Sequence, residues 1–343
     1  MTQDRAIQTS LGLCAAVLVI TALYFAREVL APVTFSIFII AILWPFQSLL
    51  QARLPKLLAL AVTLVATLAV ITVFAFLLVW GFSRIYVWIV GNSARFQALY
   101  MQATEWLEGH GVSIANQMAE NFNVSWIIRA VQEIAGRVQN LISFAIITVI
   151  FMILGLLEID IAKRNIERLE NREVRQVLLQ IGEDIAAKFQ KYMLVRTVMS
   201  VLTGAVIWGV ALLAGLELAT AWGVIAFVLN FIPFIGPLIA TVFPTLFAIA
   251  QFESWQLALI VFLCLNLIQF LIGSYFEPRI AGAALAVSPF LILLAVFFWS
   301  FLWGLPGAFI GVPIVIALLT VCEQRASTKW VATLLSGRDG TPA

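Results

Sequence analysis

Eight long stretches of this chain contain no Asp, Glu, Lys or Arg, and this feature restricts the possible folds more than any other. A helix needs about 20 apolar residues to cross the hydrocarbon layer of a bilayer, and every stretch reaches that length. The sequence lacks the short segments of alternating apolar and polar residues that a membrane barrel requires. We therefore predict an all-α integral membrane protein with about eight transmembrane helices. The stretches cover residues 6–26, 29–52, 57–83, 138–157, 197–216, 218–252, 254–276 and 280–322.

Composition and charge agree with this class. Of the 343 residues, 63% are hydrophobic and 11% are charged, whereas a soluble domain carries about 25% charged residues. The net charge is +2, and the basic residues of the main loop are interleaved with acidic ones, so we expect no nucleic-acid partner. Cys14, Cys264 and Cys322 lie inside charge-free stretches, where a thiol is usually a small hydrophobe. We expect no metal site and no cofactor.

The residues that common intramembrane enzymes use are missing from these stretches. The single histidine, His110, lies in a loop, and no stretch contains an aspartate, which argues against the serine, metallo and aspartyl protease arrangements. No Gly-x-x-x-x-Gly-Lys-Ser/Thr loop is present to bind the phosphates of ATP. We expect no catalytic residues and no enzyme activity.

The basic residues predict the orientation of the chain, because loops rich in Lys and Arg are retained in the cytoplasm. Residues 159–196 carry most of them, so this segment is expected on the cytoplasmic side. If every stretch crosses once, both termini are also cytoplasmic. The basic residues of this segment are Lys163, Arg164, Arg168, Arg172, Arg175, Lys188, Lys191 and Arg196.

The chain divides into six parts on this basis. Apolar residues recur at helical spacing between Trp126 and Val138, so a helix outside the cytoplasm is expected to run into the fourth span. The parts are 1–83 with the first three transmembrane helices, 84–137 as an extracytoplasmic amphipathic helical segment, 138–158 as the fourth helix, 159–196 as a cytoplasmic helical segment, 197–322 as a C-terminal transmembrane core with broken helices, and 323–343 as a cytoplasmic tail.

The stretches 218–252 and 280–322 are too long to be simple spans. As straight helices they would measure about 52 and 64 Å at a rise of 1.5 Å per residue. Proline removes a backbone donor and glycine weakens a helix, so we predict broken helices or re-entrant hairpins in both. A long kinked crossing remains the alternative, and the two arrangements place Glu277 and Arg279 on opposite sides. The expected breaking and hinge residues are Pro233, Gly236, Pro237 and Pro244 in the first stretch, and Pro289, Gly304, Pro306, Gly307, Gly311 and Pro313 in the second.

Polar side chains near these breaks are the candidate solute contacts, because exposed amides and carbonyls at a broken helix can bind a polar solute. Asn230 precedes the Pro233 break and could bind solute or cap the helix. Asn266, Gln269 and Glu277 share one predicted helical face with Gly273. This face could line a path or bond neighbouring helices, and Glu277 with Arg279 could form an interfacial ion pair. The predicted pathway residues are Asn230, Pro233, Gly236, Pro237, Asn266, Gln269, Glu277 and Arg279.

Four segments resemble the AI-2E transporters, also called PerM-like permeases, in order and spacing. They are NFIPFIGP at 230–237, EPRIAG at 277–282, Ser288 with Pro289, and FWSFLWGLPGAFIGVP at 298–313. The likeness covers roughly residues 11–322. The resemblance implies a multi-span permease of the bacterial inner membrane that forms homo-oligomers, with pentamers expected. Some relatives are described as exporters of autoinducer-2 and others as sodium/proton antiporters.

These observations predict a membrane permease that exports a small polar solute such as the autoinducer-2 signal. The charge-free stretches contain no carboxylate, which a cation or proton antiporter usually needs within the membrane. A neutral solute bound by amides therefore suits the sequence better. The alternatives are an antiporter of the same family that relies on Glu277, and a membrane scaffold that transports nothing.

Overall fold

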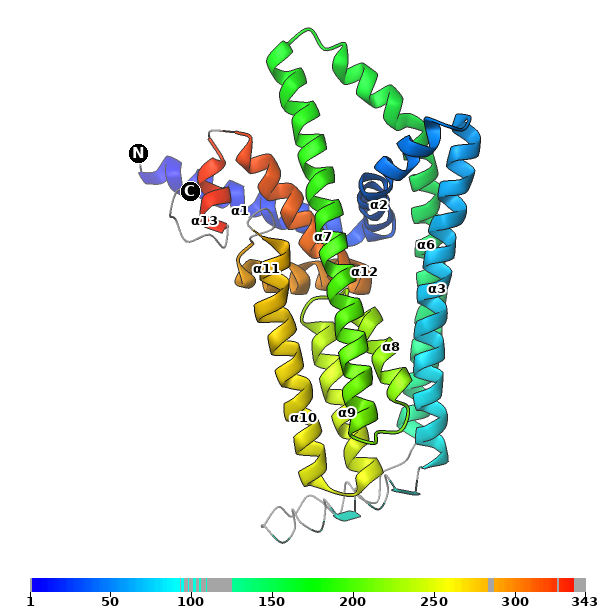
Figure 1. Cartoon of the computed structure of the whole chain (residues 1–343). Helices are drawn as coiled ribbons and strands as arrows, with labels where there is room; N and C mark the ends of the chain where they lie inside the picture. Colours follow the sequence, from blue (N-terminus) through cyan, green and yellow to red (C-terminus); the bar gives the residue numbers. More distant parts are fainter. Residues whose placement is uncertain are drawn as a thin grey trace. The chain divides into compact units, whose positions relative to one another are not determined.

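The computed structural model describes most of the chain as long helices (Figure 1). It describes residues 2–92, 94–95, 98, 101–102, 105, 109, 125–282, 287–325 and 327–335; for 2–7, 9 and 125–141 it describes the backbone alone. Part of the segment expected outside the cytoplasm, including His110, lies outside the described residues, as does the end of the expected tail. Every regular element in the described part of the chain is helical, so the predicted all-α class is confirmed.

The helices follow the charge-free stretches. Two of them, at 125–167 and 172–213, also include charged segments that flank a stretch. The first half contains α1 (Thr2–Phe25), α2 (Arg27–Gln51), α3 (Lys56–Gly91), α6 (Ser125–Glu167) and α7 (Arg172–Leu213). The second half contains α8 (Ala219–Leu229), α9 (Ile235–Phe252), α10 (Trp255–Phe270), the π-helix η1 (Leu271–Phe276), α11 (Glu277–Ala281), α12 (Pro289–Glu323) and α13 (Lys329–Leu335). α6 is continuous from the expected extracytoplasmic helix through the fourth span.

Seven helices of the described residues are long and apolar enough to cross a membrane, so the predicted number of about eight is not confirmed as an exact count. The first stretch corresponds to α1, a helix of 24 residues in which only Ser10–Phe25 is a continuous run with described side chains. The sixth stretch is divided into α8 and α9, and only α9 has sufficient length. The chain is therefore a multi-pass membrane protein in which one predicted span is a short helix paired with a longer one.

The helices belong to two compact units. Unit 1 contains Met1–Leu64, Leu141–Met193 and Ala283–Ala343, and unit 2 contains Val65–Asn140 and Leu194–Gly282. Unit 1 packs aromatic rings at its centre, with Phe35 5.4 Å from Phe309 and Phe38 5.0 Å from Phe189 between ring centroids.

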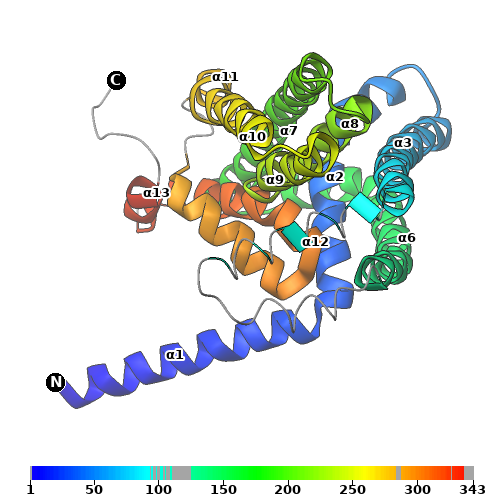
Figure 2. The same cartoon turned by 90° about the horizontal axis from the view of Figure 1, so that it is seen from below.

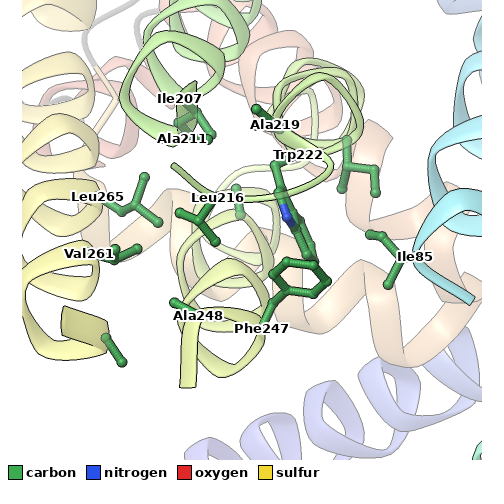
Figure 3. Close-up of a cluster of buried hydrophobic side chains, with 14 of the residues drawn as sticks. Ile85, Ile207, Ala211, Leu216, Ala219, Trp222, Phe247, Ala248, Val261 and Leu265 are labelled. Atoms are coloured by element: carbon green, nitrogen blue, oxygen red, sulfur yellow. The ribbon is translucent and has the colours of Figure 1, made fainter. Parts of the chain in front are cut away.

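The core of unit 2 forms where α3, α7, α8, α9 and α10 meet (Figure 3). Phe247 of α9 lies between Trp88 and Trp222, with ring centroids 4.1 and 5.2 Å away. Small side chains such as Ala226 and Ala248 are fully buried beside these rings. Because Ala adds little volume, the helix backbones can approach closely around the aromatic residues.

The stretch 218–252 is a helical hairpin, which we call the first hairpin. α8 packs against α9, so Trp222 contacts Phe247 although 25 positions separate them along the chain. The two ends meet as well: the Gln251 side chain donates to the Gly215 carbonyl and accepts from the Glu217 backbone N–H, both at 2.8 Å. The stretch therefore begins and ends at the same end of unit 2, as a re-entrant hairpin does.

α12 also doubles back, and its two halves form the second hairpin (orange in Figure 2). The chain turns at Gly304, where φ is 68° and ψ is −145°. Ala295 packs in one cluster with Val315 and Leu319, which in a straight helix would lie at least about 30 Å away. Of the two arrangements that the sequence left open, the hairpin is the one found in both stretches.

Candidate functional site

Asn230 lies at the end of α8, where the first hairpin turns. Its side chain is 5% exposed, and its Nδ2 donates a hydrogen bond to Ser200 Oγ of α7 at 3.2 Å. Pro233, three residues later, is buried and has no backbone N–H to donate. The predicted break therefore holds a buried amide against α7, within unit 2.

Phe234 forms the turn itself, in a conformation that L-residues rarely adopt. Its φ is 62° and its ψ is −47°, and the Ile235 N–H bonds the Pro233 carbonyl at 2.7 Å. This is a γ-turn of the rare type with positive φ, which is strained. Backbone strain of this kind is concentrated at functional sites, because the surrounding structure must maintain it.

A glycine follows the turn in each hairpin and allows two backbones to touch. A Cβ at Gly236 would overlap the carbonyl of Leu229, and a Cβ at Gly307 would overlap the carbonyl of Trp299. Pro237 and Pro306 stand beside these glycines, in the first turn of each returning helix, where an N–H has no helical acceptor. The glycines and prolines that were predicted to break these helices thus permit tight hairpins without leaving a backbone N–H unpaired.

Glu277 lies at the start of α11 and pairs with α7. Its Oε1 is 3.1 Å from Nη1 of Arg196, whose side chain is only 8% exposed. The neighbouring Arg279 is exposed and stacks over the Tyr275 ring, with 4.0 Å between its Cζ and the ring centroid. The carboxylate therefore pairs with an arginine 81 positions earlier in the chain and not with the nearby Arg279 considered from the sequence.

The pairing with Arg196 also shows beside which part of α7 Glu277 lies. Arg196 precedes the charge-free part of α7, whereas Gly215 and the foot of the first hairpin follow it. Glu277 therefore lies at the Arg196 end of unit 2, opposite the foot of the hairpin. The first hairpin returns to its foot, and α10, η1 and α11 then run once along unit 2 from the foot to the Arg196 end, which accounts for this placement.

Three polar side chains on one face of α7 form a buried column, and sequence reasoning did not find it. Arg196, Ser200 and Thr203 recur at i, i+4 and i+7, and each is 7% exposed or less. The first two bind Glu277 and Asn230. Thr203 Oγ1 has no hydrogen-bond partner among the described residues. The helical spacing of these residues could have revealed the column, but Arg196 was counted only as a loop charge.

The predicted face of α10 is less uniform than its spacing suggested. Asn266 is exposed, and its amide donates to the Phe262 carbonyl of its own helix at 2.8 Å. Gln269 is half-buried, and its Nε2 has no partner among the described residues. Gly273 lies inside η1, where hydrogen bonds run from i to i+5, so the register of Glu277 differs from that of a continuous α-helix.

The expected hinge residues of the second hairpin are distributed along unit 1. Pro289 begins α12, Gly304 forms the turn, and Pro313 lies buried within the returning half. The end of this hairpin is fixed to the early part of α7, where Lys188 Nζ lies 2.6 Å from the Glu323 carboxylate. Unit 1 therefore holds an anchored hairpin without a counterpart of Asn230 at its turn.

The column is chemically suited to exchange one polar partner for another. A buried polar group without a partner costs about 1–3 kcal/mol, so a solute that replaces an internal hydrogen bond changes the free energy little. The ion pair of the buried Arg196 with Glu277 is costly to break, because loss of either partner leaves the other charge uncompensated. The pairs Asn230–Ser200 and Arg196–Glu277 are closed in this conformation.

A multi-pass helical protein with two interrupted helices and buried polar residues beside one interruption belongs to the class of membrane transporters by architecture. The sequence comparisons specify the family. The model of the AI-2E family transporters matches residues 13–326, which is most of the chain, so the chain belongs to this transporter family.

Proteins of several bacteria are similar to this chain in sequence. An Escherichia coli protein named AI-2 transport protein TqsA is 27% identical over 331 residues, which cover 93% of each chain. A protein of Borreliella burgdorferi is 30% identical over 217 residues, covering 62% of this chain and 58% of its own. A protein of Haemophilus influenzae is 25% identical over 354 residues and 96% of each chain. The names of the last two suggest transport and give no solute.

Proposed function

We propose that this chain exports a small, neutral, polar solute such as autoinducer-2 across the bacterial inner membrane. The observation that carries this proposal is the buried column of Arg196, Ser200 and Thr203 beside the strained turn of the first hairpin. The membership of the AI-2E family and the name of the E. coli relative support transport of such a solute.

In the proposed mechanism, the solute replaces the bond between Asn230 and Ser200. Movement of the first hairpin separates this pair, and hydroxyl groups of the solute take over the freed amide and hydroxyl. Thr203 offers a further hydroxyl at the next turn of α7. A neutral solute suits this set, because Arg196, the one cation buried among the residues that the structure describes, is already balanced by Glu277.

The localisation and assembly belong to the same proposal. Both termini face the cytoplasm, since the basic segment 159–196 is retained there. The chain works as a homo-oligomer, with a pentamer expected from the family resemblance. Native mass spectrometry of the detergent-solubilised chain measures the number of copies.

A flux assay tests the function. Purified protein in proteoliposomes should move autoinducer-2 with a saturable rate, and Asn230→Ala should lower that rate about 5- to 30-fold, because one buried bonding group is worth about 1–2 kcal/mol. Asn266→Ala is the matched comparison, since Asn266 bonds only its own helix in this structure. Asn266→Ala should lower the transport rate much less than Asn230→Ala does.

Three results would contradict the proposal. The first is the absence of saturable flux in the wild-type protein, which a scaffold would produce. The second is an equal effect of the two asparagine variants, with both proteins folded. The third is a change of vesicle pH on sodium addition without solute flux, which an antiporter would produce.

A further inference from the structure

A pocket lies on unit 2 at the foot of the first hairpin, away from the buried column. Its volume is about 390 Å³. Five of its lining residues recur at i, i+3, i+4, i+7 and i+8 on α3, so they form one face of that helix. The sixth comes from the turn before α8. The lining residues are Trp80, Ser83, Arg84, Val87, Trp88 and Leu218.

The pocket lies where the apolar part of α3 gives way to charge. The charge-free stretch 57–83 ends immediately before Arg84, so this turn of α3 corresponds to the membrane surface. Tryptophan is enriched at this depth because its ring is apolar and its N–H is polar. The pocket therefore offers an apolar wall toward the bilayer core and a polar rim at its surface.

The wall opposite α3 is held in place by hydrogen bonds. The Trp88 Nε1 donates to the Glu217 carboxylate, and Glu217 is itself bonded to Gln251 through its backbone N–H. Leu218 follows in a left-handed conformation, with φ of 59°. Glu217 is not a lining residue, and its carboxylate is engaged with the indole at the edge of the pocket.

Arg84 gives the pocket its charge. Its Cζ lies 5.8 Å from the centroid of the Trp80 ring, and its side chain is exposed. Among the residues that the structure describes, no carboxylate forms an ion pair with Arg84, whereas the buried Arg196 has Glu277. A guanidinium presents a planar fork of donors that matches phosphate oxygens. The Ser83 hydroxyl beside it donates to the Val79 carbonyl of its own helix at 2.7 Å in this structure, and it rotates away from that carbonyl when it donates to a phosphate oxygen.

We propose that this pocket binds an anionic phospholipid. The phosphate lies on Arg84 and Ser83, and the apolar part of the lipid packs against Trp80, Val87 and Leu218. The site lies at the membrane surface, where an amphiphile with one negative charge matches both the apolar wall and the cationic rim. This proposal does not depend on the solute that the column carries.

Thermal unfolding of the full chain in detergent tests the proposal. Phosphatidylglycerol should raise the unfolding midpoint more than phosphatidylcholine, because only the former carries a net negative charge. Arg84→Gln should remove this difference and weaken phosphatidylglycerol binding about fivefold, the effect of one basic residue near an anionic surface. Ser83→Ala should reduce the difference by a smaller amount. Native mass spectrometry should show fewer bound phosphatidylglycerol molecules on the Arg84 variant.

Arg27→Gln is the control, since Arg27 is another exposed arginine that stacks on an aromatic ring, with its Cζ 4.9 Å from the Tyr24 centroid. The control should retain the full phosphatidylglycerol effect. Equal shifts with both lipids, or an undiminished effect in Arg84→Gln, would overturn the proposal. Inorganic phosphate that reproduces the whole shift would indicate a free-anion site and would also overturn it.

Discussion

The two hairpins share a construction but differ at the turn. Each has a glycine and a proline in the first turn of its returning helix, and each turns at one residue with positive φ. In the second hairpin that residue is Gly304, which adopts such a conformation at little cost. In the first hairpin that residue is Phe234, for which the same positive φ is strained. The strained turn is also the one beside Asn230 and the buried column, so this difference favours the first hairpin as the moving element.

The largest effects are expected at the two packing glycines. Gly236→Ala and Gly307→Ala each place a methyl group on a backbone carbonyl that cannot move aside, so each should destabilise the protein by about 3 kcal/mol. The thermal unfolding midpoint in detergent measures this loss. Gly209→Ala on α7 is the control, because a methyl group there meets nothing within 4 Å. Equal midpoints for all three variants would refute close backbone contact in the hairpins.

The ion pair beside the first hairpin should produce the next largest effect. Arg196→Gln leaves the Glu277 carboxylate without its partner, and Glu277→Gln leaves the buried guanidinium without its own. We expect each change to cost about 2 kcal/mol, below the value for a fully buried pair because Glu277 is partly exposed. The double variant should recover part of the loss. Additive losses in a double-mutant cycle would show that the two side chains do not interact.

The turn residues test the comparison directly. Gly304→Ala should destabilise the protein by about 2 kcal/mol, because the new methyl group meets open space and only the backbone conformation becomes unfavourable. Phe234→Gly should have the opposite sign and raise the unfolding midpoint by relieving strain, since Phe234 is 44% exposed and contributes little burial. A lower midpoint for Phe234→Gly would mean that the ring matters more than the backbone, and the comparison would fail.

The smallest expected effect on stability is at Thr203. Replacing it with valine keeps the shape and removes a buried hydroxyl that has no partner among the described residues, so stability should stay the same or rise by about 1 kcal/mol. Solute flux in proteoliposomes should nevertheless fall. A purely structural hydroxyl would give the reverse pattern, with lower stability and normal flux.

The hairpins also illustrate how much of this architecture the sequence could predict. Stretch length and the breakers around Pro233 and Pro306 correctly indicated two interruptions, because proline and glycine act locally. The direction of the chain after each interruption was not predictable, since it depends on tertiary contacts such as Trp222 with Phe247. The exact number of spans is not confirmed, since seven helices of the described residues have sufficient length and the sixth stretch contributes its span through α9 alone.

The candidate site was predicted only in part for a similar reason. Asn230 and Glu277 stood out because polar residues are rare near long apolar stretches. Their partners Ser200 and Arg196 lie 30 and 81 positions earlier, and such pairings require the fold. Asn266 was expected on the same face as Glu277, but the π-helix η1 between them changes the register.

That π-helix makes Glu277 sensitive to a change of chain length. A π-helix is an α-helix with a residue added to one turn, so deleting one residue from η1 would restore ordinary helical bonding without removing any apolar contact of α10. The deletion would rotate everything after it by about one residue's step around the axis, and the carboxylate would face away from Arg196. A single deleted codon could therefore disconnect α11 from α7 while the bundle remains intact.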